Sequence, residues 1–335
     1  MKKILWQSKS QLVFDSFYER RLLPGANGGN AYDVHTLNVL AEKYPVSVSE
    51  DAVLKKGESL LVYWNRMRNV KPVEDVIIME PYPVVFGKRY QGKIHIAMIH
   101  HIDDHLGSST IKHRWYFNRL KKKLREMDVV VTVSSYWKNY LESMGCKSVK
   151  VIYNSFAPDQ FVHTDSELKK FRHQYGLPEN KPVLYIGNAT RQKGVYDVYE
   201  ALKNREYYLV MTGETNLAED LPVHYLNLGK KEYTQLLATA DAVICMSKMV
   251  EGWNRIAHEA LLSRTPVIGS GSGGMKELLD RAGQLTASPA QLAEAVSTIL
   301  LHKESFAQRG FEYVSRFDQK YFSEEWNGLI RSVQK

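Results

Sequence analysis

Cysteine is scarce in this sequence, and long hydrophobic runs are missing. The two cysteines, Cys146 and Cys245, lie far apart in a chain of 335 residues. Such a pair forms neither a metal-binding motif nor a disulfide framework, which favours a reducing compartment such as the cytoplasm. No run reaches the ~18 apolar residues that a membrane-spanning helix needs, and the first apolar stretch is too short for a signal peptide. Because low-complexity tracts and internal repeats are also missing, we expect globular, cytoplasmic domains.

Positive charge is concentrated in the first half of the chain. Residues 1–157 contain 24 Lys/Arg and 15 Asp/Glu, a balance of +9, whereas the remainder contains 21 and 22, a balance of −1. The densest cluster consists of Arg119, Lys121, Lys122, Lys123 and Arg125. It is either a solvated helix face or a surface for an anionic partner such as a phospholipid headgroup or a lipid phosphate. Nucleic acid is disfavoured, because aromatic residues do not interleave with these cations.

Short apolar runs alternate with amphipathic stretches, which predicts βαβ units and a parallel sheet covered by helices on both faces. In the first half we expect strands at Lys3–Trp6, Leu60–Tyr63, Val76–Met79, Ile94–Ile99, Val129–Val133 and Val149–Tyr153. The second half repeats the pattern, with strands at Val183–Ile186, Tyr208–Met211, Val223–Leu226, Ala242–Cys245 and Pro266–Ile268. The fold class is therefore α/β, with two facing doubly wound, Rossmann-like domains. Ligands bind beyond the carboxyl ends of such strands, so we expect the active site in a cleft between the domains.

The segment from Glu251 to Glu259 follows an expected strand and opens an expected helix. The backbone N–H groups at a helix start and the helix dipole form an anion site. A carboxylate on either side of a phosphate suits a sugar nucleotide, because a carboxylate accepts two hydroxyl protons from one diol. The alternative is a pair of surface glutamates.

This segment resembles the donor signature of the retaining glycosyltransferases of group 1, also called family 4, which have the two-domain GT-B architecture. Two glutamates are separated by seven residues, with Gly-Trp after the first and Ala-Leu after the second. The resemblance implies that Glu251 binds donor-sugar hydroxyls and that Glu259 binds the ribose. It also implies that the backbone amides of the intervening loop meet the distal phosphate. That loop comprises Gly252, Trp253, Asn254 and Arg255, in which Trp253 replaces the usual Phe and Asn254 the usual Gly.

A second match lies between Gly187 and Gly194, where Arg191 and Lys193 stand on a loop after an expected strand. Two cations there would neutralise a diphosphate leaving group, Arg through a bidentate fork and Lys as a point charge. The segment resembles the basic pair that precedes a Lys-Gly helix start in the same family. The alternative is two loop charges in solvent.

Histidines and aspartates gather after the expected strand Ile94–Ile99. They are His100, His101, Asp103, Asp104 and His105. A metal site is one interpretation, but the hydrolase pattern His-x-His-x-Asp-His would place its second histidine at Ile102. The resemblance implies instead that His100 faces the donor sugar and positions it, with His101 as the alternative if the strand register shifts by one. A core or surface histidine remains a third interpretation.

Glycines follow the first expected strand, in the segment from Pro24 to Asn30. Gly28 and Gly29 would let the backbone approach a phosphate closely, beside a helix start. The resemblance implies that this loop lies under the donor diphosphate and near the acceptor. The alternative is a plain turn.

The resemblance therefore implies a retaining glycosyltransferase, which we expect to be metal-independent and without a cofactor. By the same resemblance it would transfer a hexosyl group, with glucosyl favoured, from a UDP-sugar to a glycan or lipid-linked acceptor in polysaccharide biosynthesis. Residues 1–157 would bind the acceptor, residues 158–316 the nucleotide sugar, and residues 317–335 would cross back as a helix. Peripheral association with the inner membrane face through the basic first domain is a further expectation. The alternatives are a nucleotide-sugar 2-epimerase of the same fold and a non-catalytic sugar-nucleotide binder.

Overall fold

The computed structural model describes residues 2–103, 110–213 and 221–333. The chain forms two compact units, of which unit 1 contains residues 1–154 and 320–335, and unit 2 contains residues 155–319. The sequence placed the boundary after residue 157 and the start of the crossover segment at residue 317. Each of these predicted positions lies three residues from the observed one.

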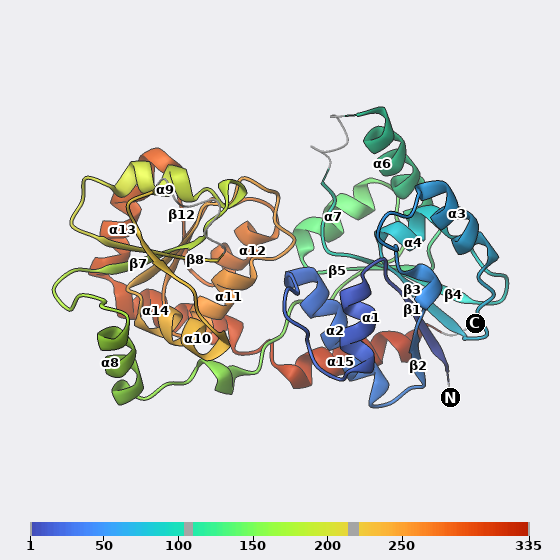
Figure 1. The fold of residues 1–335 in the computed structure, drawn as a ribbon, viewed down its shortest axis with the longest axis horizontal. Coiled ribbons are helices and arrows are strands. Elements are labelled where there is room, and N and C mark those ends of the chain that lie inside the picture. Colours follow the sequence, from blue (N-terminus) through green and yellow to red (C-terminus); the bar gives the residue numbers. More distant parts are fainter. Residues whose placement is uncertain (1, 104–109, 214–220, 334–335) are drawn as a thin grey trace. The chain divides into compact units, whose positions relative to one another are not determined.

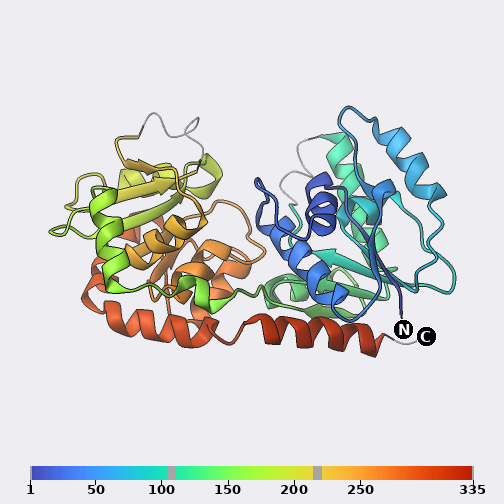
Figure 2. The ribbon, with the colours of Figure 1, turned by 60° about the horizontal axis from the view of Figure 1, so that its bottom comes forward.

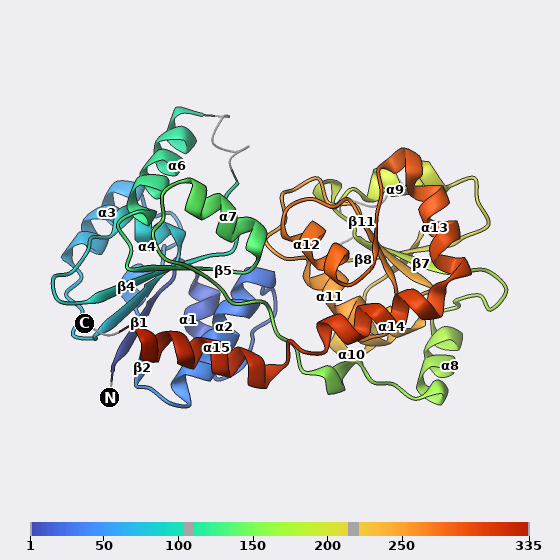
Figure 3. The ribbon, with the colours of Figure 1, turned by 180° about the vertical axis from the view of Figure 1, so that it is seen from behind.

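Unit 1 is built on a parallel sheet with the strand order β2-β1-β3-β4-β5-β6 among the described residues. Its strands are β1 (Ile4–Gln7), β2 (Val46–Val48), β3 (Val76–Met79), β4 (Ile94–Ile99), β5 (Val129–Thr132) and β6 (Val149–Val151). Its helices are α1 (Gln11–Tyr18), α2 (Gly28–Ala41), α3 (Leu60–Asn69), α4 (Pro81–Phe86), α6 (Ile111–Leu124), α7 (Ser135–Ser143) and α15 (Gln319–Ser332). Helices α1, α2 and α15 cover one face of the sheet, and α3, α4, α6 and α7 cover the other (Figure 1 and Figure 3).

Unit 2 repeats this architecture on a second parallel sheet, with the order β12-β11-β10-β7-β8-β9 within the described ranges. Its strands are β7 (Val183–Asn188), β8 (Tyr208–Thr212), β9 (His224–Leu226), β10 (Ala242–Cys245), β11 (Val267–Gly269) and β12 (Leu285–Thr286). Its helices are α8 (Asp165–Gln174), α9 (Val195–Leu202), α10 (Lys230–Thr239), α11 (Arg255–Leu262), α12 (Gly274–Arg281), α13 (Leu292–Leu301) and α14 (Lys303–Val314). Helices α9 and α13 lie on one face, and α8, α10, α11 and α14 lie on the other (Figure 1).

The central strands consist of buried residues throughout. Every residue of β3, β4 and β10 is buried. Since helices cover both faces of each sheet, such parallel strands read as continuous apolar runs in the sequence. This is why the predicted bounds of these strands agree with the observed ones.

The predicted strand Leu60–Tyr63 is wrong, because these residues begin helix α3. Ser59 caps this helix through its side-chain oxygen, which accepts a hydrogen bond from the Val62 amide at 3.3 Å. Leu61 and Val62 are 75% and 59% exposed, so of this apolar run only Tyr63 lies in the core. A short apolar run carries no periodicity that distinguishes a strand from a helix. Here the Ser59 cap indicates a helix.

Helix α15 returns the C-terminal segment to unit 1, as Figure 2 shows. Its Trp326 ring lies 6.4 Å from the Trp6 ring in β1, and its Phe322 ring lies 5.1 Å from Tyr32 in α2. Unit 1 is thus completed by residues from the far end of the sequence. Among the described residues, no helix combines the length and the hydropathy that crossing a bilayer requires.

Each sheet contains a point where the chain connections leave in opposite directions. It lies between β1 and β3 in unit 1 and between β7 and β10 in unit 2. In open α/β sheets, ligands bind beyond the carboxyl ends of the strands at such a switch point. The loops after β1, β3, β7 and β10 are therefore the places to look for functional side chains.

Candidate active site

At the switch point of unit 2, the loops after β7 and β10 are joined by an ion pair. The Lys193 Nζ lies 2.8 Å from the Glu251 Oε1, although the two residues are 58 positions apart. The Lys193 side chain is 34% exposed and that of Glu251 is 12% exposed. Two residues that the sequence singled out separately are thus brought together at the sheet edge where a ligand is expected.

Two glycines allow the backbone to pack closely around this ion pair. Gly194 has φ +74°, and a Cβ at that position would overlap the Met246 carbonyl oxygen. Gly273 has φ +63°, and a Cβ there would overlap the carbonyl oxygen of Glu251. The Gly274 amide donates a hydrogen bond to that same oxygen at 2.8 Å. Both positions favour glycine for steric and conformational reasons, and the turn at Gly273 holds the backbone of Glu251 in place.

The start of helix α11 is organised by Asn254 and Trp253. The Asn254 side chain accepts a hydrogen bond from the Ala257 amide at 2.9 Å and so caps the helix. Trp253 is 5% exposed, and its Nε1 donates to the His258 Nδ1 at 3.1 Å. Burial, aided by the nearby Arg255, lowers the pKa of His258 to about 3, so the ring stays neutral and accepts this bond. Both side chains therefore support the helix, and any contact of this loop with a phosphate would come from its backbone amides.

Glu259 lies on α11, beyond the first turn, and its side chain is 16% exposed. The Tyr233 hydroxyl donates to its Oε2 at 3.0 Å, and the Arg255 Nη2 lies 3.6 Å from its Oε1. Burial raises the pKa of the Glu259 carboxyl, while Arg255, Tyr233 and Lys230 oppose this rise. Both oxygens are thus held in fixed directions, as a group that binds a diol must be.

In unit 1, the structure brings His100 together with the start of α2. The His100 Nε2 lies 2.9 Å from the Asp33 Oδ1, and a Cβ on Gly29 would lie 3.3 Å from the His100 ring. Gly28 and Gly29 form the first turn of α2, which Asn27 caps. His101 is more exposed, at 40% of its side chain, and lies 3.9 Å from Asp103. Of the two histidines, His100 is the one anchored at the glycine turn.

Sequence reasoning missed a carboxyl group at the switch point of unit 1. Glu80 follows β3 directly and is 8% exposed. Its Oε1 accepts a hydrogen bond from the Trp6 Nε1 at 3.0 Å, and its Oε2 accepts one from the Ser8 hydroxyl at 2.8 Å. Burial, together with the nearby Asp33, raises the pKa of Glu80 well above its usual value. The sequence feature that could have identified Glu80 is its position as a carboxylate immediately after a fully apolar strand.

Some predicted positions lie outside the described part of the structure. They are the side chain of Arg191, and Asp104 and His105 of the histidine and aspartate cluster. Among the residues that are described, no three His, Cys, Asp or Glu side chains are placed to hold a metal ion. The metal interpretation of that cluster thus gains no support from its described members, and it is not tested at His105.

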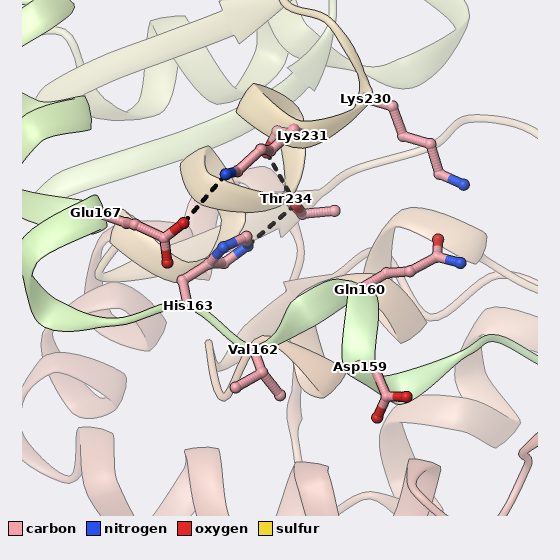
Figure 4. Close-up of a pocket in the computed structure, with 8 residues that line it drawn as sticks. All are labelled: Asp159, Gln160, Val162, His163, Glu167, Lys230, Lys231 and Thr234. Carbon is pink, nitrogen blue, oxygen red and sulfur yellow. Dashed lines mark hydrogen bonds and ion pairs between the residues drawn. The ribbon is translucent and has the colours of Figure 1, made fainter.

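A pocket of about 450 Å³ lies in unit 2 between α8 and α10 (Figure 4). Its lining residues are Asp159, Gln160, Val162, His163, Glu167, Lys230, Lys231 and Thr234. The Lys231 Nζ lies 3.1 Å from Glu167, and the His163 Nε2 lies 3.0 Å from the Thr234 hydroxyl. Lys230, one of the lining residues, also acts electrostatically on Glu259 of α11. No predicted site residue lines it.

Comparison with known proteins gives consistent matches over both units. Residues 168–310 match the family model described as glycosyl transferases group 1, and residues 52–160 match that described as Glycosyltransferase Family 4. An uncharacterized glycosyltransferase of Methanocaldococcus jannaschii is 23% identical over 258 residues, which are 72% of this chain and 67% of that protein. Other curated relatives are matched over 38–58% of their own length, so the chain spans about half of most of them.

Solved structures resemble the whole chain. Sucrose-phosphate synthase from Thermosynechococcus elongatus has a TM-score of 0.78 at 18% identity, covering 99% of both chains. HepE from Anabaena, solved in complex with UDP-glucose, has a TM-score of 0.72 at 19% identity, covering 99% of this chain and 100% of its own. At these identities the likeness concerns the fold. It confirms the predicted fold class of two doubly wound, Rossmann-like units of the GT-B type.

Proposed function

Since the chain belongs to the group 1 glycosyltransferases, we propose that it transfers a hexosyl group from a UDP-sugar to a glycan or lipid-linked acceptor in polysaccharide biosynthesis. The transfer proceeds with retention at the anomeric carbon. The observation that carries this proposal is the Lys193–Glu251 ion pair of 2.8 Å at the switch point of unit 2. The HepE complex supports UDP-glucose as the first donor to test.

In this proposal the ion pair opens when the donor binds. Lys193 moves its charge to the diphosphate, and Glu251 accepts hydrogen bonds from the sugar hydroxyls instead. The amides of the Gly252–Arg255 loop, with Arg191 as a second cation, stabilise the charge that develops on the leaving diphosphate. Because these groups supply the positive charge, the reaction requires no metal ion or other cofactor.

Glu259 binds the ribose hydroxyls in this arrangement. Its two oxygens are oriented by Tyr233 and Arg255. His100, anchored by Asp33 at the Gly28–Gly29 turn, positions a sugar hydroxyl.

The test is an assay of UDP release from UDP-glucose, with and without a lipid-linked acceptor. Acceptor-dependent release that persists in EDTA supports a metal-independent transferase. Formation of a sugar isomer or of UDP without any acceptor would indicate the 2-epimerase. Binding of UDP-glucose without turnover, in the presence of several acceptors, would indicate a non-catalytic binder.

Two variants separate the proposed roles within this assay. Replacing Glu251 by Gln removes the group that contacts the reacting sugar, so kcat should fall by about 100-fold or more while UDP affinity changes little. Replacing Glu259 by Gln should instead weaken UDP binding by about tenfold, since it removes a charged hydrogen-bond acceptor. Equal effects of both variants on UDP affinity would contradict this division.

We propose in addition that unit 1 binds the surface of an anionic membrane through α3 and α6. Helix α6 carries six Lys and Arg residues and no Asp or Glu, and α3 adds Arg66 and Arg68. The two helices are joined by Trp64 and Trp115, whose rings lie 5.9 Å apart. Their exposed apolar residues are Leu60, Leu61, Val62, Ile111 and Trp115. Exposed apolar side chains surrounded by cations are the pattern of an interfacial membrane-binding surface.

Vesicle sedimentation tests this surface independently of catalysis. Binding should be strong with vesicles that contain phosphatidylglycerol and weak with pure phosphatidylcholine. Salt should reduce binding, because screening by ions weakens the attraction between the lysines and arginines and the anionic headgroups. A double replacement of Ile111 and Trp115 by Ser should reduce binding by about tenfold. Val162→Ser is the matched control, since Val162 is 75% exposed and belongs to unit 2. Binding that ignores lipid charge, salt and the double replacement would overturn the assignment.

A further inference from the structure

Beneath His100, a chain of buried polar groups runs through unit 1. The His100 Nε2 meets the Asp33 Oδ1 at 2.9 Å. Asp33 lies near Glu80 and contributes to the raised pKa of its carboxyl, and Glu80 accepts hydrogen bonds from Trp6 and Ser8. Asp33 and Glu80 are 3% and 8% exposed. Residues from four separate segments of the sequence thus meet in one polar network at the switch point of this sheet.

The two carboxyl groups in this network cannot both be ionised. Two buried carboxylates in contact repel each other and lose their hydration, so such a pair keeps one proton. Burial and the nearby Asp33 raise the pKa of Glu80 well above its usual range, which assigns the proton to Glu80. Three other titratable groups interact with the pair. They are Lys9, which acts electrostatically on Glu80 and whose own pKa burial lowers, Tyr63, which also interacts electrostatically with Glu80, and Tyr32, which interacts with Asp33.

The direction of each hydrogen bond follows from that proton. A neutral Glu80 still accepts from Trp6 and Ser8 with its lone pairs. A carboxylate oxygen only accepts, so across the 2.9 Å contact the His100 Nε2 carries a hydrogen and donates it to the Asp33 Oδ1. In a neutral imidazole the other nitrogen, Nδ1, is then an acceptor.

We infer that Asp33 is a positioning residue that holds His100 in the Nε2–H tautomer, so that His100 presents Nδ1 as an acceptor to a ligand hydroxyl. This deepens the proposed function, on which the identity of the ligand rests, because it states which kind of group the site selects. A sugar hydroxyl donates to Nδ1. A carbonyl or carboxylate oxygen placed at the same point has no hydrogen to donate and is rejected.

Nitrogen-15 NMR of the full chain with labelled histidine tests the tautomer directly. At pH 8, where an ordinary histidine is neutral, the His100 signals should be those of an Nε2–H imidazole. They are assigned by their loss in a His100→Gln variant. An Nδ1–H tautomer or a fully protonated ring in the wild-type protein would overturn the inference. This measurement needs neither donor nor turnover, so it stands even if the proposed glycosyl transfer fails.

Two variants distinguish positioning from mere structural support. Asp33→Asn offers His100 an amide that can donate as well as accept, so the Nδ1–H tautomer should appear and kcat/KM for the sugar donor should fall by about tenfold or more. UDP affinity should change less than twofold. Asp280→Asn on the surface of α12 is the matched control, and it should leave both the tautomer and kcat/KM within about twofold of wild type. If Asp280→Asn shifts the tautomer as Asp33→Asn does, or if Asp33→Asn leaves it unchanged, the inference is wrong.

Discussion

The two units place charge at their switch points in opposite ways. Unit 2 pairs opposite charges, Lys193 and Glu251, on loops that retain some exposure to solvent. Unit 1 instead buries two carboxyl groups, Asp33 and Glu80, against each other. A partly exposed ion pair costs little to open, because water and an incoming phosphate replace the lost contact. A buried pair of like charges must retain a proton and cannot exchange partners in this way. The first arrangement suits exchange with a ligand, and the second suits a fixed orientation.

The largest expected effect concerns the stability of unit 2. It tests whether the Lys193–Glu251 site lies beside a rigidly packed helix start. Trp253→Ala removes a buried ring and leaves the His258 Nδ1 without its donor, so unit 2 should lose about 3–5 kcal/mol of unfolding free energy. Urea-induced unfolding measures this loss. Leu301→Ala, at a residue 77% exposed on α13, is the control and should change the stability by about 0.5 kcal/mol or less. A small loss for Trp253→Ala would show that this side chain is not structural.

Removing the cation from the unit 2 pair should weaken nucleotide binding next most strongly. Lys193→Met deletes a charged hydrogen-bond donor, worth about 1.5–3 kcal/mol, so the Kd for UDP should rise by about 10- to 100-fold. Isothermal titration calorimetry measures the change. Lys276→Met is the matched control, because Lys276 pairs with Asp280 on the surface of α12. If both variants bind UDP alike, Lys193 does not act on the phosphate.

The buried pair of unit 1 should make stability depend on pH. The pKa of Glu80 is raised in the folded state above its ordinary value of 4.5, so the folded state holds its proton where the unfolded chain has lost it. Its contribution is present at low pH and declines as pH rises from about 4.5 towards the raised pKa, by about 1.4 kcal/mol for each pH unit. Glu80→Gln should remove this decline. Parallel pH profiles of unfolding free energy for both proteins would contradict a neutral Glu80.

The smallest effect concerns the helix start in unit 2. Asn254→Ala removes the cap on the Ala257 amide and should cost about 1 kcal/mol. Asn254→Asp keeps an acceptor at the same place and should retain most of the stability. Thermal unfolding compares the two variants. An equal loss in both would mean that Asn254 acts by some route other than capping.

The two units also differ in how much of their candidate site could be predicted. In unit 2, Glu251, Glu259 and Lys193 belong to two short motifs, so their importance is visible in local spacing. The same motif implied that the backbone amides around Trp253 and Asn254 meet the distal phosphate, and the structure adds that the side chains of these two residues cap and support α11. Spacing cannot reveal this, because a side chain's direction depends on neighbours such as His258 that the fold brings close.

In unit 1, the structure brings His100 close to the Gly28–Gly29 turn, and the roles of these residues stay predictions. The sequence did not single out Asp33 and Glu80, because their significance arises only from each other. Asp33 stands within a helix and Glu80 after a strand, and nothing in either neighbourhood indicates a second carboxyl group. The helix at Leu60–Asn69 was missed for a related reason, since the serine cap before its apolar run was not weighed.

The amino-acid sequence by itself determined the alternation of buried strands and amphipathic helices, the two-domain division and the family motifs, because each depends on residues that are near one another in the chain. Only the tertiary structure decided which side chains meet at the switch points. Parallel strands that neighbour each other in a sheet come from distant parts of the chain, so the ion pair in unit 2 and the shared proton in unit 1 exist only once the strands have paired.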